Sequence, residues 1–446
     1  MSTKSNKLDR RSFLKGTATA GVGLALAPNI LSCAAADTAK GDDINVAIIG
    51  AGTQGRILLK DSLKIPNLRF KAVCDIWPYS QRYASRRLKG YKHIVNVYAD
   101  YREMLEKEKD LDAVIIATPD WVHAEHAVAC LKAGLHVYCE KEMSNNLESA
   151  RQMVLAEKSS GKLLQIGHQR RSNPMYLNAL ELIGKDGICG RLTNCYGQWN
   201  RAVQPKLTWP EKYAMDAETL KKYGYDTMDK FRNWRWYEKF SAGPIADLGS
   251  HQIDIFSWFL HNEPTSVMAV GGSDYYEGRG WYEDVMVIYE YLYKHKGKSG
   301  SVRAFYQVLN TNGFGSYFER FGGDKGTLTI SEDKKKCYYV PERGTELPAW
   351  MQDAEKVQQS GHQAIMLASA IEKKSPAGAK AMNILQEKNV HQLHLENFFE
   401  AIRADDKKIL TCLAEVAYPT AVSVLNVIPA IKAGAKHNFK PEDYKA

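Results

Sequence analysis

A glycine-rich turn that directly follows a short apolar run constrains this chain more than any other feature. Residues 44–49 are mainly apolar, and the run is short enough to form one buried strand of a parallel sheet. The next residues, Gly50-Ala51-Gly52-Thr53-Gln54-Gly55, fit the spacing G-x-G-x-x-G and open a predicted helix. Glycine lets the backbone approach a ligand closely, and the amides at a helix start can receive a pyrophosphate. The pattern predicts a dinucleotide-binding turn; the alternative is a tight strand-to-helix turn that binds nothing.

An acidic residue stands where such a fold usually recognises a ribose. Asp75 ends the next strand-like run, 20 residues after Gly55. Because the 2′-phosphate of NADP would meet the negative charge of this carboxylate, the position favours NAD over NADP. Nearby arginines could offset part of that charge: Arg82, Arg86 and Arg87. The alternative is a solvated residue at a strand end.

Strands and helices alternate from the turn to about residue 164, which is typical of a parallel sheet covered on both faces. Strand-like segments then follow one another with fewer helices, at 192–199, 266–271, 284–291, 302–309 and 326–330. The predicted fold is therefore α/β, with an N-terminal Rossmann doubly wound parallel sheet and a C-terminal α+β domain built on an open, mainly antiparallel sheet. Four predicted helices are expected to cover one side of that second sheet: 174–183, 251–260, 391–403 and 414–431.

Four parts are predicted along the chain: a targeting segment (1–36), a polar linker (37–43), an NAD-binding domain (44–165) and a substrate-binding domain (166–446). In the targeting segment, basic residues precede a mildly apolar stretch, and Arg10-Arg11-Ser12-Phe13-Leu14-Lys15 resembles a twin-arginine export signal. The alternative is an ordinary basic tail. The sequence thus predicts export by the twin-arginine machinery to the periplasm, with cleavage after Ala36 or a lipid anchor at Cys33.

Charge and cysteine spacing argue against two classes of function. Loss of the targeting segment removes five basic residues and one acidic residue, so the formal charge falls from +9 to +5. That charge is too small to indicate binding to nucleic acid. No two of the eight cysteines show the spacing C-x-x-C, so no metal site and no thiol chemistry is predicted. Cys74, Cys130 and Cys139 lie in apolar segments and are expected to be buried thiols.

Three further motifs occur in order along the chain: Ala117-Thr118-Pro119-Asp120-Trp121-Val122-His123, then Glu140-Lys141, then Asp247-Leu248-Gly249-Ser250-His251-Gln252-Ile253-Asp254. Together they resemble the glucose–fructose oxidoreductase and inositol dehydrogenase (Gfo/Idh/MocA) family over nearly the whole mature chain. Members of that family join a Rossmann domain to a substrate domain on an open sheet, and many act on sugars or cyclitols. The resemblance implies an NAD-dependent oxidoreductase acting on CH–OH groups, with a sugar, glycoside or cyclitol as substrate.

The resemblance also implies roles for single residues. Lys141 faces the nicotinamide and the substrate, Asp247 binds or orients the substrate, and His251 is the candidate acceptor of the alcohol proton. Lys141 is the alternative acceptor of that proton. Asp247 and His251 are four residues apart and share one helical face, and the ordinary pKa of histidine suits proton transfer near neutrality. Without the motifs, the same residues would be read as an exposed lysine, a helix-start aspartate and a packed histidine.

The sequence also suggests further residues that contact the cofactor or the substrate. The resemblance implies cofactor contacts for Thr118, Pro119, His123 and Glu140. Arg171 is a candidate contact to cofactor or substrate, with support of the domain junction as the alternative. Trp234 and Trp236 end an aromatic insert from residue 200 to 237 and suit stacking on a sugar ring, although they are equally good core material. Where the family usually has proline, this chain has Glu142, which adds a negative charge beside Lys141.

Three functions remain open from the sequence. The favoured one is hydride transfer between a sugar or cyclitol hydroxyl and NAD. A second is an NAD-dependent glycosidase or lyase that oxidises a sugar hydroxyl transiently. A third is a carbohydrate-binding protein without activity. Because no freely exchanging NADH pool is expected outside the cytoplasm, an exported enzyme of this kind should hold NAD tightly. The exposed face of the second sheet would suit formation of a homo-oligomer.

Overall fold

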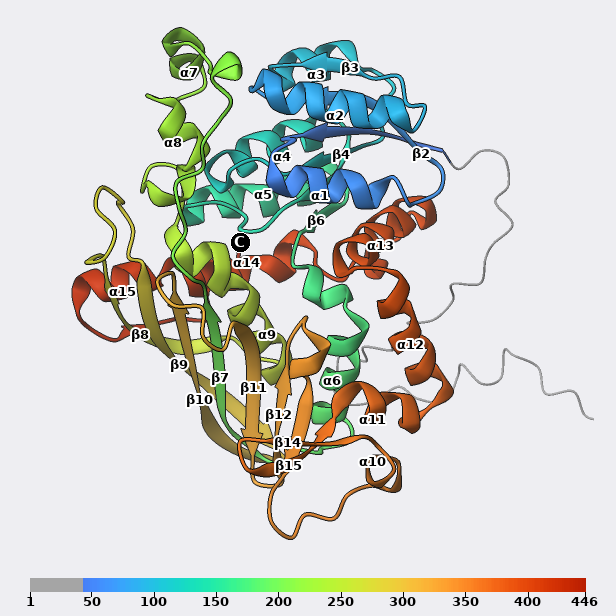
Figure 1. Cartoon of the computed structure of the whole chain (residues 1–446), viewed down its shortest axis with the longest axis vertical. Helices are drawn as coiled ribbons and strands as arrows, with labels where there is room; N and C mark the ends of the chain where they lie inside the picture. Colours follow the sequence, from blue (N-terminus) through green and yellow to red (C-terminus); the bar gives the residue numbers. More distant parts are fainter. Residues whose placement is uncertain (1–42) are drawn as a thin grey trace, which may run out of the picture. The chain divides into compact units, whose positions relative to one another are not determined.

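The computed structural model describes residues 43–446, and its first sheet has six parallel strands in the order β3-β2-β1-β4-β5-β6 (Figure 1). The strands are β1 (Ile44–Ile49), β2 (Leu68–Cys74), β3 (Asn96–Tyr98), β4 (Ala113–Ile116), β5 (His136–Cys139) and β6 (Leu164–Ile166). The order reverses between β1 and β4, which is where doubly wound sheets bind their ligands. The predicted export signal and Cys33 lie outside the described residues.

Alternate residues of the central strands face two different cores. Ala47 and Ile49 of β1 belong to one buried cluster, whereas Val46 and Ile48 belong to another. A strand that buries both faces needs helices on both sides of the sheet. The connecting helices are α1 (Thr53–Ser62), α2 (Pro78–Gly90), α3 (Tyr101–Lys107), α4 (His123–Lys132) and α5 (Leu147–Ser160). The predicted Rossmann architecture is thereby confirmed.

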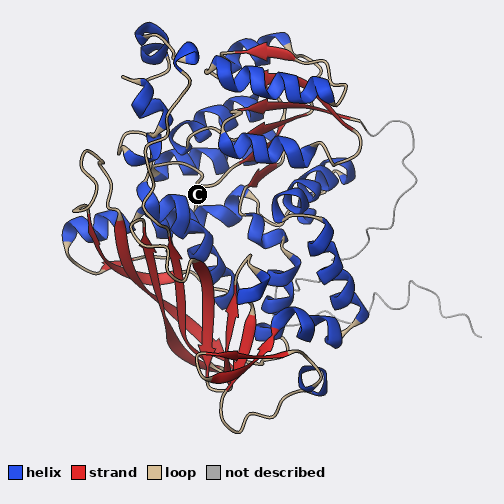
Figure 2. Cartoon of the chain, in the orientation of Figure 1, coloured by secondary structure: helices blue, strands red, loops and turns tan. Residues whose placement is uncertain are grey.

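The second sheet has ten strands in the order β14-β15-β13-β12-β11-β7-β10-β9-β8-β16 (Figure 2). All neighbouring pairs are antiparallel except β7 with β10. The strands are β7 (Leu192–Asn200), β8 (Pro264–Gly272), β9 (Asp284–His295), β10 (Lys298–Leu309), β11 (Tyr317–Gly323), β12 (Gly326–Ile330), β13 (Tyr338–Pro341), β14 (Lys356–Gln359), β15 (His362–Met366) and β16 (His437–Asn438). This confirms the predicted open, mainly antiparallel sheet.

One face of the second sheet packs on helices and the other does not. In β9, Val285 and Val287 are buried, whereas Met286 and Ile288 between them are exposed, as expected of a half-covered strand. The covering helices are α6 (Pro174–Gly184), α9 (Ser250–Leu260), α14 (Ala414–Leu425) and α15 (Val427–Ala433). The segment Ala414–Ala433 is long and apolar enough to cross a membrane, but 61% of its apolar 18-residue window is buried inside the protein, like a core helix.

The helix predicted over 391–403 does not cover the second sheet. It is α13 (Val390–Ala404), which packs against α1 and buries Leu395, Phe398 and Phe399 in the core of the first sheet. His394 fixes it there by pairing with the Ile166 carbonyl oxygen at the end of β6 (2.9 Å). The periodicity of the sequence identified the apolar face of this helix, but it could not show which of the two sheets that face packs against. The boundary between residues 165 and 166 stays a prediction.

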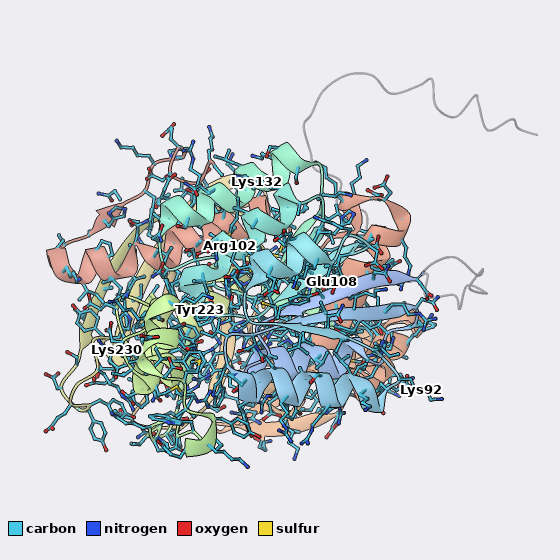
Figure 3. All side chains as sticks on the ribbon, turned by 90° about the horizontal axis from the view of Figure 1, so that it is seen from above. Lys92, Arg102, Glu108, Lys132, Tyr223 and Lys230 are labelled. Carbon is cyan, nitrogen blue, oxygen red and sulfur yellow. The ribbon has the colours of Figure 1, made fainter. Side chains whose placement is uncertain are left out.

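The other helices are α7 (Ala217–Lys222), α8 (Met228–Arg232), α10 (Ala349–Gln352), α11 (Leu367–Lys374) and α12 (Pro376–Glu387). All seven cysteines in the described part of the chain are buried free thiols, including the three for which this was expected. Long basic side chains such as Lys92 and Lys132 point outward into solvent (Figure 3).

Candidate active site

A cavity of about 900 Å³ opens at the carboxyl ends of β1, β2, β4 and β5. Its wall continues onto the second domain through Trp199, Asp247 and His251. Residues 200–237, which we call the strap, close a further side: Arg102 of the first domain and Tyr223 of the strap both line the cavity. The position is the switch point of the parallel sheet, where this class of fold binds nucleotides.

The three glycines of the first turn have different roles, two in packing and one at open space. Gly50 has φ +89°, and a Cβ there would lie 2.7 Å from the carbonyl carbon of Ala117. A Cβ on Gly55 would lie 2.0 Å from the Gly50 oxygen, so both positions need glycine for packing alone. At Gly52 a Cβ would meet nothing within 4 Å, and α1 begins here without a side-chain cap. The turn therefore leaves open space beside helix-start amides that no side chain of the described residues caps, and such amides fit a pyrophosphate.

Asp75 lies at the cavity beside this turn. Its two carboxylate oxygens accept hydrogen bonds from the backbone amides of Ala51 (2.7 Å) and Trp77 (2.8 Å). Burial raises the pKa of Asp75 to about 6, although these hydrogen bonds act in the opposite direction. The residue thus fixes the shape of the turn and remains available to a ribose. The other expected cofactor contacts that line the cavity are Thr53, Gln54, Thr118, Pro119, His123 and Glu140.

Lys141 and Asp247 meet at the domain junction. The Lys141 ammonium donates a hydrogen bond to the Asp247 carbonyl oxygen and lies 3.8 Å from its carboxylate. Arg235 contacts that carboxylate at 3.0 Å and Arg201 at 3.7 Å. Burial alone would raise the pKa of Asp247, but the positive charges of Arg235, Lys141 and Arg201 together lower it. Asp247 is therefore ionised and anchors three cations around the cavity.

His251 joins this cluster from the first turn of α9. Asp247 lies just before it, in a π-helical turn over Ile245–Gly249, so both side chains reach the cavity as their spacing predicts. The imidazole lies beside Trp199, with 5.4 Å between ring centroids. Burial, followed by the charge of Lys141, lowers the pKa of His251 well below its usual value. The ring is neutral at pH 7, and its Nδ1 makes no hydrogen bond within the described residues.

Two buried carboxyl groups at the cavity were not predicted as functional. Burial raises the pKa of Asp120 to about 7, and that of Glu142 also to about 7. Each has one oxygen, Asp120 Oδ1 and Glu142 Oε2, without a hydrogen-bond partner among residues 43–446. Asp120 stands inside the motif from Ala117 to His123, but sequence cannot show which residue of a motif is buried at a cavity. Arg201 and Arg235 were missed for another reason, because they belong to residues 200–237, which reach the cavity only through the fold of the chain.

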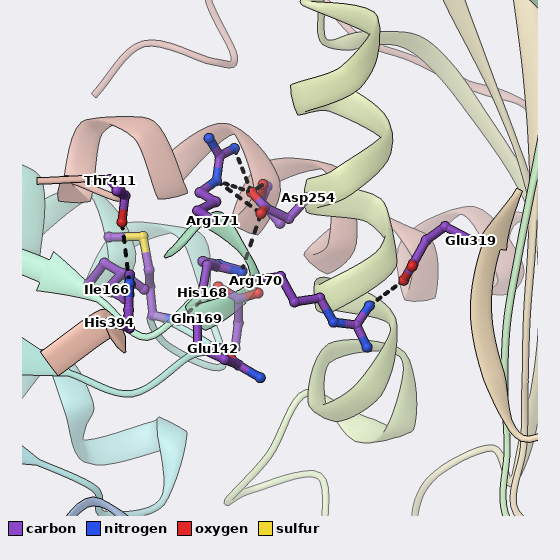
Figure 4. Close-up of polar contacts among 12 residues, drawn as sticks. Glu142, Ile166, His168, Gln169, Arg170, Arg171, Asp254, Glu319, His394 and Thr411 are labelled. Carbon is purple, nitrogen blue, oxygen red and sulfur yellow. Dashed lines mark hydrogen bonds and ion pairs between the residues drawn. The ribbon is translucent and has the colours of Figure 1, made fainter. Parts of the chain in front are cut away.

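The remaining predicted site residues differ in whether they reach the cavity. The two ring nitrogens of His123 lie 2.7 and 2.8 Å from the carbonyl oxygens of Glu142 and Thr118, so this buried side chain joins two loops. Arg171 does not line the cavity; it donates to both carboxylate oxygens of Asp254 at 2.7 to 3.0 Å (Figure 4). Trp234 and Trp236 both line the cavity, and the Arg235 guanidinium lies 4.2 Å from the Trp234 ring centroid.

The strap is bound to the first domain by an aromatic cluster. Tyr225 and Phe231 of the strap pack with Trp77 and Trp121 of the first domain. The Trp77 indole donates a hydrogen bond to the Tyr213 carbonyl oxygen (2.6 Å). The strap therefore runs from the second domain across to the nucleotide-binding side. No group of residues able to hold a metal ion occurs in the described part of the chain.

Two family models match the chain. Residues 44–168 match the oxidoreductase family with an NAD-binding Rossmann fold, and residues 176–329 match the GFO/IDH/MocA C-terminal domain. A solved structure of levoglucosan dehydrogenase with NADH and levoglucosan shares the fold, with a TM-score of 0.64 at 18% identity, covering 89% of this chain and 99% of that one.

Curated relatives align over shorter stretches. The chain is 25% identical to inositol 2-dehydrogenase/D-chiro-inositol 3-dehydrogenase of Shouchella clausii, over 49% of this chain and 54% of that protein. It is 24% identical to 2,7-anhydro-N-acetylneuraminate hydratase of Escherichia coli, over 64% of this chain and 67% of that protein. The chain thus spans little more than half the length of the inositol dehydrogenase. The two family models cover more than half of the sequence, and the chain therefore belongs to the GFO/IDH/MocA oxidoreductase family.

Proposed function

We propose that this protein is an exported NAD-dependent oxidoreductase that transfers hydride between a sugar or cyclitol hydroxyl and nicotinamide. The observation that carries the proposal is the shared cavity, in which the glycine turn and Asp75 face one part and Lys141, Asp247 and His251 face another. The NAD-binding Rossmann fold of the oxidoreductase family and the inositol dehydrogenase relative both support it.

The side chains suit removal of a proton from an alcohol. His251 is neutral, so it can accept the hydroxyl proton, and the Lys141 ammonium can stabilise negative charge on the same oxygen. Asp247 keeps Lys141 in place and can accept a hydrogen bond from a neighbouring hydroxyl. Trp234 and Trp236 offer aromatic faces for the apolar side of a sugar ring. Nicotinamide, when bound, supplies the hydride acceptor.

The first experiment concerns the cofactor and the substrate together. The purified mature protein is examined by absorbance and mass spectrometry for NAD that co-purifies, and is then screened with free sugars, cyclitols and glycosides. Reduction of the bound cofactor by a polyol supports the proposal. If no dinucleotide binds and no polyol reduces added NAD, the proposal is wrong.

A second candidate is an NAD-dependent glycosidase or lyase that oxidises a sugar hydroxyl transiently and recycles its cofactor. Elimination next to a carbonyl needs a further acid or base, and the buried carboxyl groups of Asp120 and Glu142 could hold or release a proton near pH 7. The relative named as a hydratase also supports this candidate. Net cleavage of a glycoside without accumulation of NADH favours it, whereas stoichiometric release of NADH rules it out.

Export and assembly complete the proposal. Arg10 and Arg11 support transport by the twin-arginine machinery to the periplasm. The exported protein would then either carry a lipid anchor at Cys33 or be cleaved after Ala36. Replacement of both arginines by lysine should leave the precursor in the cytoplasm, and the mass of the mature N-terminus distinguishes lipidation from cleavage after Ala36. A homo-oligomer is proposed through the uncovered face of the second sheet.

A further inference from the structure

The strap ends in a single 3₁₀ turn beside the reaction centre. The turn spans Trp234–Trp236, and all three of its residues line the cavity. Because a 3₁₀ helix has three residues per turn, consecutive side chains point about 120° apart. The turn therefore presents its three side chains to three different parts of the molecule.

The contacts of each side chain identify these three directions. Trp234 packs against the aromatic cluster that binds the strap to the first domain. Arg235 contacts the Asp247 carboxylate at 3.0 Å and so faces the reaction centre. Trp236 lies instead beside the loop between β8 and β9, where the Arg279 guanidinium is 3.5 Å from its ring centroid. Trp236 therefore lines the cavity next to the reaction centre rather than within it.

Arg279 fixes the Trp236 ring from one side. The same guanidinium lies 3.3 Å from the Tyr276 ring centroid and donates a hydrogen bond to the Gln204 carbonyl oxygen (2.8 Å). The Gly280 amide donates to the Trp236 carbonyl oxygen (2.8 Å), which fixes the backbone as well. A guanidinium over one face of an indole is held by a cation–π interaction. Since Trp236 is only partly buried, its remaining surface is available to a ligand in the cavity.

The residues around this ring suit a sugar. Gln204 and Pro205 also line the cavity, and Gln204 is exposed. The side-chain nitrogen of Gln204 donates to the Ala202 carbonyl oxygen (3.0 Å), which leaves its Oε1 to accept a hydrogen bond from a hydroxyl. An aromatic face can pack on the apolar C–H side of a sugar while an amide beside it binds the hydroxyls.

We propose that Trp236 binds the sugar ring next to the one that reacts, so that the preferred substrate is a glycoside with at least two sugar rings. Arg279 is a positioning residue, because it holds the Trp236 ring and does not itself touch the substrate. This inference rests on the proposed function and names the substrate class of the same cavity. If Trp236 merely closed the cavity, its loss would affect small and large sugars alike.

The test begins with the wild-type protein, supplied with NAD and three matched pairs of compounds: methyl β-D-glucoside with cellobiose, methyl β-D-galactoside with lactose, and methyl β-D-mannoside with β-1,4-mannobiose. Turnover is followed as reduction of the cofactor and as product by chromatography. In at least one pair, kcat/KM of the disaccharide should be higher by about fivefold or more, the usual worth of one stacking contact. Smaller ratios in all pairs, or no turnover of any compound, overturn this inference. The proposed function is decided separately, by dinucleotide binding and the wider polyol screen.

Single variants then locate the second ring. Trp236→Ala should lower kcat/KM of the favoured disaccharide about fivefold or more and that of its methyl glycoside less than about twofold. Arg279→Gln should act in the same direction, whereas Arg279→Lys keeps the cation and should retain most of the preference. Trp350→Ala is the matched control, because Trp350 also lies beside a cation, Lys374, but does not line the cavity.

Equal loss for both members of the pair in Trp236→Ala would assign the ring to closing the cavity and overturn the inference. A preference that Arg279→Gln leaves unchanged would overturn the role of Arg279. Circular dichroism checks the fold of each variant; should one not fold, the wild-type ratios still decide.

Discussion

Lys141 combines exposure to the cavity with tight anchoring by Asp247. Its replacement by methionine keeps an unbranched side chain that is one atom shorter and removes the charge and the hydrogen bonds. We expect turnover by Lys141→Met to fall roughly 10²- to 10⁴-fold, the usual range for loss of one acid–base or charge-stabilising group. NAD binding, measured by calorimetry, should change less than about threefold. Lys132→Met, on the outer surface of α4, is the control; full activity of Lys141→Met would remove the assignment.

His251 allows a test by pH. It must be neutral to accept a proton, and its pKa in the folded protein is lowered by burial. Activity that depends on it is therefore lost only as the pH falls through that lowered value, so the acid limb of kcat/KM should lie below pH 6.5. His251→Asn should lose that limb together with roughly 10²-fold or more of the activity. An acid limb centred at or above pH 6.5 in the wild type would contradict this role.

At the scale of elements, the strap should control how long the cofactor stays bound. Tyr225 is buried between Trp121, Phe231 and Phe240. Truncation of a buried aromatic side chain costs about 3–5 kcal/mol of packing. If the strap loosens locally, Tyr225→Ala should release NAD at least tenfold faster in stopped-flow fluorescence. Tyr225→Phe keeps the ring and loses only the hydrogen bond from Trp121, so it should resemble the wild type; equal release rates in all three proteins would contradict the prediction.

Docking of α13 should depend on pH through His394. Its Nδ1 pairs with the Ser172 hydroxyl (2.7 Å) and its Nε2 with the Ile166 carbonyl oxygen, and Thr411 lies beside it (Figure 4). Burial lowers the pKa of His394 to about 3. Because the unfolded chain binds the proton near pH 6.5, this contribution to stability is complete above that pH and is lost as the pH falls towards 3.

The corresponding measurement compares the free energy of unfolding of the wild type and His394→Gln by urea titration. The wild type should be more stable by about 1–3 kcal/mol at pH 8, since the variant leaves buried groups unpaired. At pH 5 the advantage should be smaller by about 2 kcal/mol. That pH lies roughly 1.5 units below the histidine pKa of the unfolded chain, and each unit is worth about 1.4 kcal/mol of stability. Independence of this difference from pH would show that His394 does not titrate as stated.

Local patterns predicted elements well and long-range partners poorly. The run from residue 44 to Gly55 specified strand, turn and helix, because buried strands and glycine turns leave strong signals over a few residues. The apolar face of α13 was equally visible, but whether it packs on one sheet or the other depends on contacts far apart in sequence. Likewise Lys141, Asp247 and His251 were named from motifs, whereas Arg201, Arg235 and Arg232 reach the cavity only because the strap folds back.

At the scale of the whole molecule, the uncovered face of the second sheet predicts self-association. Directly paired residues on β8 and β9 expose apolar side chains there: Met268 opposite Ile288, and Val270 opposite Met286. Met268 and Val270 are 51% and 64% exposed. Adjacent apolar residues on paired strands form one continuous patch, and such patches commonly mark an interface between subunits.

A cross-strand charge pair tests this interface without weakening the sheet. In Met268→Glu/Ile288→Lys the new side chains lie opposite each other, so they attract within one subunit but must lose water if two subunits associate. Light scattering after size exclusion should find an oligomer for the wild type and a monomer for the double variant, with unchanged circular dichroism. Ile94→Glu should leave the oligomer intact, because Ile94 is 94% exposed and lies in the first domain, between α2 and β3. A monomeric wild type, or an oligomer that survives the double substitution, would mean that this apolar face serves another purpose.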